Sequence, residues 1–148
     1  GTLSLFILLL AFLIPIITDT FAYLMGSLIK GKKLCPNISP NKTISGAIGG
    51  VIWTVIFVTC LYLIFDTIGA YNAMFEALNL ELWHIIILSL IASVACQLGD
   101  IFESFLKRKA GVKDAGNLLP GHGGVLDRVD SHIFNAVVIF VFFLIFII

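Results

Sequence analysis

Charged and glycine residues gather in one stretch of this chain, between Gln97 and Ser131. It holds five of the nine Lys and Arg residues and five of the nine Asp and Glu residues. Within it, the run Pro-Gly-His-Gly-Gly (120–124) is closely followed by Asp-Arg-Val-Asp (127–130). Glycines let a backbone approach a ligand closely, and successive N–H groups can cradle an anion. Carboxylates from two segments beside cations and such a loop indicate a site for Mg²⁺ and a polyphosphate.

Each carboxylate also has a simpler interpretation. Asp127 and Asp130 share a face at the start of a predicted helix, where the helix dipole favours acidic residues anyway. Glu103 can pair with Lys107 four residues later, a bridge worth a few tenths of a kcal/mol. Asp100 lies deeper in an apolar run, where a carboxylate is costly unless a cation or a polar cavity accompanies it. Asp100 therefore favours a functional site.

The basic residues at 107–109 and 113 form a cationic cluster. Alone, such a cluster is best explained by topology and by attraction to anionic lipid. Its position directly before the glycine run favours phosphate binding instead.

The elements that must hold these residues are membrane helices. The 148 residues are 59% hydrophobic and 12% charged, well beyond the apolar share of a soluble domain. About 20 helical residues cross a bilayer of roughly 30 Å, and backbone groups inside lipid must be satisfied within a helix. We therefore predict one all-α integral membrane domain over 1–148, a bundle of about four transmembrane helices. The four apolar runs are about 3–25, 45–65, 82–105 and 132–148.

Loop charge predicts the orientation of this bundle. The loops at 27–44 and 105–131 carry every Lys and Arg, whereas the loop at 66–81 carries acidic residues only. By the positive-inside rule, both basic loops are cytoplasmic, and both termini lie on the opposite side.

The first two runs add further candidates. Asp19 lies near the cytoplasmic end of the first run and either snorkels to the interface or faces a polar cavity, which a kink at Pro15 would help to open. Lys42 is an ordinary positive-inside residue or meets a phosphate at the entrance of the second helix. Thr43 or Ser45 can cap that helix.

Small residues inside the runs are expected to be structural. Gly46, Gly49 and Gly50 predict close helix packing rather than a ligand site. Cys60 and Cys96 lie in apolar segments and are expected to be small core residues.

Three blocks of the sequence resemble the phosphatidate cytidylyltransferase (CDP-diacylglycerol synthase) family. The first is its signature: Ser104-Phe-Leu-Lys-Arg, Lys113-Asp114 and Pro120-Gly-His-Gly-Gly-Val-Leu-Asp-Arg-Val-Asp130. The others are Asp19-Thr-Phe-Ala-Tyr23 and Ser39-Pro-Asn-Lys-Thr43. Family members are longer, with additional N-terminal helices, so the resemblance is to their C-terminal, site-bearing part. The chain departs from the family at Asn41 and Ser45, where Lys and Glu are common.

The resemblance implies transfer of a cytidylyl group from CTP to phosphatidate, giving CDP-diacylglycerol and pyrophosphate. It implies Mg²⁺, with or without a second cation, and a bacterial inner-membrane location with a cytoplasmic site. The expected partners are CTP, phosphatidate and the lipid bilayer, with no nucleic acid. The small bundle also favours a homodimer. The residues expected to act on phosphates are Lys107, Arg108, Lys113, Asp114, His122, Arg128 and Asp130. Those expected to bind the nucleotide or to line its cavity are Gly121, Gly123, Gly124, Ser104, Lys42 and Asp19. The expected metal ligands are Asp100, Asp127 and Asp130.

Three alternatives stay open. The first is a CTP-dependent synthase acting on an archaeal-type ether lipid. The second is a small transporter or proton relay lined by Asp19, Asp100 and Glu103, which would need neither CTP nor the glycine run. The third is a non-catalytic scaffold, which the presence of Asp100, Asp127 and the whole glycine run disfavours.

Overall fold

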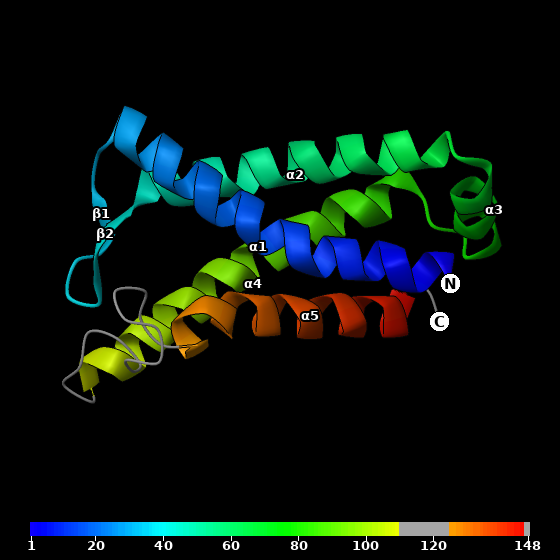
Figure 1. Cartoon of the computed structure of the whole chain (residues 1–148). Coiled ribbons are helices and arrows are strands. Elements are labelled where there is room, and N and C mark those ends of the chain that lie inside the picture. Colours follow the sequence, from blue (N-terminus) through cyan, green and yellow to red (C-terminus); the bar gives the residue numbers. More distant parts are fainter. Residues whose placement is uncertain (110–124, 147–148) are drawn as a thin grey trace.

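The computed structural model describes residues 1–109 and 125–146, and the side chains of 1–109 and 132–146. Helices dominate these residues, and a short two-stranded hairpin joins the first two of them (Figure 1). The elements are α1 (Thr2–Ile29), β1 (Lys33–Cys35), β2 (Ser39–Thr43), α2 (Ile44–Asp66), α3 (Gly69–Ala77), α4 (Leu82–Lys109) and α5 (Val125–Phe146).

Three of these helices, α1, α2 and α4, are long and apolar enough to cross a membrane. The apolar part of α5, His132–Phe146, is shorter than the other three. The outer faces of the bundle expose large apolar side chains, among them Leu8, Phe140 and Ile145. A soluble domain would hide such faces, whereas lipid accommodates them. The prediction of an all-α, multi-pass membrane protein is confirmed.

The bundle separates its charges between two ends. The hairpin and the last turns of α4 lie at one end, and α3 lies at the other together with the start of α1 and the end of α5 (Figure 1). Within the described part of the chain, every Lys and Arg falls in the hairpin segment, in the last turn of α4 or, for Arg128, near the start of α5. The α3 end carries the acidic residues Asp66, Glu76 and Glu81. This separation is the one that the loop charges predicted.

Several boundaries differ from the prediction. α5 begins at Val125 rather than near His132, and α4 continues to Lys109 rather than ending near 105. Apolarity marks only the part of a helix that lies in lipid, whereas the polar turns beyond it are still helical. The segment at 66–81 contains the nine-residue helix α3, and the segment at 27–44 contains the hairpin. Neither element was predicted, because both are too short for a clear hydrophobic period.

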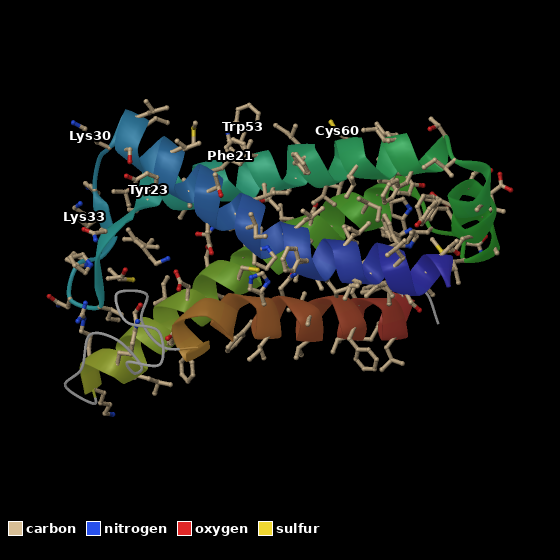
Figure 2. All side chains as sticks on the ribbon, in the orientation of Figure 1. Phe21, Tyr23, Lys30, Lys33, Trp53 and Cys60 are labelled. Carbon is tan, nitrogen blue, oxygen red and sulfur yellow. The ribbon has the colours of Figure 1, made fainter. Side chains whose placement is uncertain are left out.

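α1 and α2 pack closely at their hairpin ends. Thr43 is the N-cap of α2, and its hydroxyl accepts a hydrogen bond from the Gly46 N–H at 3.1 Å. A methyl group on Gly46 would lie 2.5 Å from the Ala22 carbonyl oxygen of α1, so only glycine fits there. Further along the same interface Phe21 and Trp53 stack with ring centroids 5.3 Å apart (Figure 2). The predicted cap and the predicted glycine packing are both confirmed.

Polar side chains tie the helices together inside the apolar core. Thr18 of α1 lies 2.8 Å from the Thr54 hydroxyl of α2 and 3.0 Å from the Ser93 hydroxyl of α4, and all three residues are fully buried. Asn135 of α5 donates to the Ala11 carbonyl of α1 at 3.0 Å. In the absence of water, such bonds fix how the helices face one another.

The two cysteines in apolar segments differ. Cys96 is buried in the core as predicted, but Cys60 is exposed on the outer face of α2 (Figure 2). The prediction for Cys60 was wrong because, in a membrane helix, a residue among apolar neighbours can face either the core or the lipid.

Candidate functional site

A pocket of about 590 Å³ opens at the hairpin end of the bundle. α1, the hairpin, the first turn of α2 and the middle of α4 all contribute to its wall. Three predicted site residues line it together: Asp19, Lys42 and Asp100. They come from positions far apart in the chain, and the fold brings them to one cavity. For Asp19 this favours the cavity-facing interpretation over snorkelling.

Lys42 and Asp100 form an ion pair across the pocket. Both side chains are partly buried, with 29% and 31% of their surfaces exposed. The pair explains how α4 carries a carboxylate within an apolar run, because the Lys42 ammonium compensates its charge. At this exposure its contribution to stability is modest, on the order of 1 kcal/mol or less. Its position on the pocket wall matters more than its energy.

The neighbouring polar contacts hold Asp100 in place. Gln97, one turn earlier on α4, also lines the pocket and donates from Nε2 to the Ala47 carbonyl of α2 at 3.0 Å. Because Ala47 lies in the first turns of α2, this bond fixes α4 against the capped end of that helix. Gln97 and Asp100 therefore both contribute to the pocket wall from α4.

Other predicted residues on α4 lie outside the pocket wall. Ser104, Lys107 and Arg108 belong to the last turns of α4 beyond it. Lys107 lies 3.8 Å from Glu103, the predicted pair at four-residue spacing. The Arg108 Nε donates to the Ile38 carbonyl at 3.3 Å, which ties the end of α4 to the hairpin. Arg108 therefore has a structural contact in addition to any role with phosphates.

The remaining predicted residues lie outside the described part of the chain. The backbone at 125–131 forms the first turns of α5, and only this backbone is described there. The residues concerned are Lys113, Asp114, Gly121, His122, Gly123 and Gly124, together with the side chains of Asp127, Arg128 and Asp130.

The pocket also contains residues that the sequence did not mark as site candidates, among them Tyr23, Lys30 and Lys33. Tyr23, on α1, is exposed and lines the pocket one turn after Asp19. Lys30 and Lys33 are also among the residues that line it, and their exposed side chains extend from the segment that follows α1 (Figure 2). These lysines were counted only as topology signals. The Pro36-Asn37 pair, which forms part of the hairpin turn, was the signal that the chain folds back here and brings these lysines near the next helix.

The described residues alone do not complete a metal site. Among them, no group of three His, Cys, Asp or Glu side chains could hold a metal ion. Asp19 of α1 and Asp100 of α4 nevertheless both line this pocket, and such hard oxygen donors suit Mg²⁺. The other predicted ligands, Asp127 and Asp130, lie on α5, where side chains are not described. The donor chemistry present therefore fits the predicted metal.

This fold and pocket define a multi-pass membrane protein with a charged cavity at one end of its helices. The chain belongs to the Cytidylyltransferase family, whose model matches residues 2–146.

Named relatives share nearly half of its residues over most of its length. It is 45% identical over 127 residues to the phosphatidate cytidylyltransferase of Staphylococcus saprophyticus, and 46% identical over 127 residues to those of Staphylococcus haemolyticus and Staphylococcus aureus. Each match covers 86% of this chain and 45% of the relative. The chain thus spans less than half the length of these relatives.

Proposed function

We propose that this chain is the site-bearing part of an enzyme that transfers a cytidylyl group from CTP to phosphatidate. The products are CDP-diacylglycerol and pyrophosphate. The observation that carries the proposal is the meeting of Asp19, Lys42 and Asp100 in one pocket of a Cytidylyltransferase-family chain. The names of the relatives supply the substrate class.

The proposed reaction joins two anions. An oxygen of the phosphatidate phosphate attacks the α-phosphorus of CTP, and the bond from that phosphorus to the β-phosphate oxygen breaks, so pyrophosphate leaves. The attacking oxygen already carries negative charge near neutral pH, so no strong general base is needed. The chief demand is on fixed positive charge, which must offset repulsion between the substrates and stabilise the leaving group.

The pocket residues match this demand. Lys42 offsets the Asp100 carboxylate, so the wall repels a polyphosphate less than a lone aspartate would. Ser104, Lys107, Arg108, Lys113 and Arg128, with the loop glycines and His122, are proposed to complete the phosphate contacts. Mg²⁺ would be held by Asp100 with Asp127 and Asp130, and it would supply further neutralisation of the triphosphate.

The location of the site follows from its charges. All Lys and Arg of the described residues lie at the pocket end. We infer that this end faces the cytoplasm, where CTP is present, and that the chain lies in a bacterial cell membrane. A pocket at the membrane face would receive the nucleotide from water and the lipid from the bilayer.

Pyrophosphate release from CTP tests the proposal. The purified protein in detergent is assayed with and without phosphatidate and with and without Mg²⁺. We expect release to require both and to be lost in Asp100→Asn, whose thermal unfolding stays close to wild type. The matched control is Glu76→Gln, an exposed acidic residue at the opposite end on α3, which should keep full activity. Release that persists in Asp100→Asn would contradict the site. Phosphatidate replaced by an ether-linked acceptor would reveal the alternative substrate.

A further inference from the structure

The Lys42 ammonium lies on the oxygen atom that a metal ion at Asp100 would use. Its Nζ contacts Oδ2 of Asp100, the carboxylate proposed above to hold Mg²⁺. An ammonium group and a divalent cation both bind a carboxylate through its oxygen lone pairs. A metal ion on the other oxygen of the same carboxylate would lie beside the ammonium and be repelled by it. The two cations therefore compete for Asp100.

The partial exposure of the pair allows one cation to replace the other. The side chain of Lys42 is 29% exposed and that of Asp100 is 31% exposed, so water can solvate the ammonium as it leaves. In a fully buried pair, the same separation would leave an uncompensated charge inside the protein. A pair this exposed is weak, and a divalent cation attracts the carboxylate with twice the charge of an ammonium.

The backbone on both sides of the pair is held in place. The Ile44 N–H, two residues after Lys42, donates to the Lys32 carbonyl at 3.1 Å. On α4, the Gln97 side chain donates to the Ala47 carbonyl of α2 at 3.0 Å. Lysine has a flexible four-carbon stem, so its ammonium can leave the carboxylate while the hairpin and α4 stay where they are. The exchange is thus a movement of one side chain.

We propose that Lys42 is a displaceable cation, which yields Asp100 to a divalent metal ion and then turns its ammonium toward the interior of the pocket. The inference rests on the proposed function for the binding of a metal ion at Asp100. Because Lys42 itself lines the pocket, the released ammonium remains beside any anionic ligand there. Metal binding and the release of a positive charge into the pocket become one event.

A purely supporting role for Lys42 predicts the opposite sign. If the ammonium served only to orient Asp100, its removal would loosen the carboxylate and weaken metal binding. If it competes with the metal, its removal tightens metal binding. The affinity of the metal ion therefore distinguishes the two roles without any turnover.

Mn²⁺ is a suitable probe, because it prefers the same oxygen ligands as Mg²⁺ and its binding is measured by electron paramagnetic resonance. The purified protein in detergent is titrated without CTP or lipid. We expect Lys42→Met to bind Mn²⁺ about fivefold more tightly, since a weak competing ion pair is lost. Lys42→Arg keeps the charge and can hold the carboxylate with two N–H groups, so it should not tighten binding. Asp100→Asn should abolish binding at this site.

Lys32→Met is the matched control for net charge. Lys32 is exposed on the same segment but does not line the pocket, so its removal should change Mn²⁺ affinity by less than about twofold. Amine labelling followed by mass spectrometry detects the exchange directly. We expect labelling of Lys42 to rise when Mn²⁺ is added and labelling of Lys32 to stay constant. In Asp100→Asn, labelling of Lys42 should be high with or without Mn²⁺.

Several results would overturn the inference. They are equal or weaker Mn²⁺ binding in Lys42→Met, equal tightening in Lys32→Met, labelling of Lys42 that does not respond to Mn²⁺, and the absence of saturable Mn²⁺ binding by the wild type. The proposed function fails separately. If Lys42→Met tightens Mn²⁺ binding but the wild type never releases pyrophosphate, the inference stands and the cytidylyl transfer does not.

Discussion

Pro15 leaves one carbonyl of α1 without its usual donor, and Asn135 of α5 takes its place. In an α-helix the N–H of residue 15 would donate to the carbonyl of residue 11, but proline has no N–H. The Asn135 Nδ2 lies 3.0 Å from the Ala11 carbonyl oxygen and 3.3 Å from that of Leu10. Asn135 is fully buried. We predict that Asn135 and Pro15 are energetically coupled, and that the coupling vanishes when residue 15 regains an N–H.

The expected magnitude follows from the two groups involved. Asn135→Leu leaves the Ala11 carbonyl unsatisfied in an apolar core, which costs roughly 1–3 kcal/mol. It also removes the Asn135 Oδ1, a buried oxygen without a hydrogen-bond partner among the described residues, and this offsets part of the loss. Bonds between membrane helices average only about 0.6 kcal/mol. We therefore expect a net loss of about 1 kcal/mol with Pro15 present and close to zero with Pro15→Ala.

A double-mutant cycle measures this coupling. The free energy of unfolding is determined in mixed micelles by denaturing detergent for wild type, Asn135→Leu, Pro15→Ala and the double variant. Val137→Ala, an exposed change on the same helix, is the control and should cost the same whichever residue stands at position 15. An equal cost of Asn135→Leu in both backgrounds would refute the reasoning and leave Asn135 as a packing residue only.

Three further predictions concern the pocket end. Thr43→Val should lower the free energy of unfolding by about 1 kcal/mol, because the Gly46 N–H loses its cap; thermal unfolding in detergent measures it, and an unchanged midpoint would contradict the cap. Gly46→Ala should destabilise the packing of α1 against α2, because its methyl group would lie 2.5 Å from the Ala22 carbonyl oxygen. Gly69→Ala, in open space on α3, is the control and should be neutral or slightly stabilising. A larger loss of stability in Gly69→Ala than in Gly46→Ala would refute the close packing. Lys42→Met should slow pyrophosphate release on the order of 10²-fold while leaving the fold intact, since it removes a fixed cation and exposes Asp100; wild-type kinetics would exclude Lys42 from the site.

The sequence predicted the membrane helices because lipid makes a strong demand on composition. A span needs a long apolar run, and α1, α2 and α4 have one. The ends of the helices escaped this reasoning. The last turn of α4 is basic, and the first turns of α5 are polar, so hydropathy stops before the helix does. The cap at Thr43 was predictable because capping depends on a few neighbouring residues.

The site was predictable in part. Asp19, Lys42 and Asp100 were each singled out by charge in or beside an apolar run, and the pocket brings them together. That Lys42 pairs with Asp100 could not be deduced, because 58 positions separate them and the pair forms only where β2 packs against α4. Lys30 and Lys33 were missed for a related reason. Loop lysines look alike in sequence, and only the fold of the turn after α1 decides which of them lie beside a cavity.

The buried hydroxyls of Thr18, Thr54 and Ser93 form a chain with a direction. Each hydroxyl has one hydrogen, and that of Thr54 is given to the Gly50 carbonyl at 2.7 Å. Thr18 must then be the donor to Thr54, and Ser93 the donor to Thr18. Removing the Ser93 hydroxyl leaves every remaining hydroxyl hydrogen with an acceptor. Removing the Thr54 hydroxyl instead leaves the buried hydroxyl hydrogen of Thr18 without its acceptor. Three similar side chains in one cluster therefore tolerate loss unequally, in an order set by the count of their hydrogens.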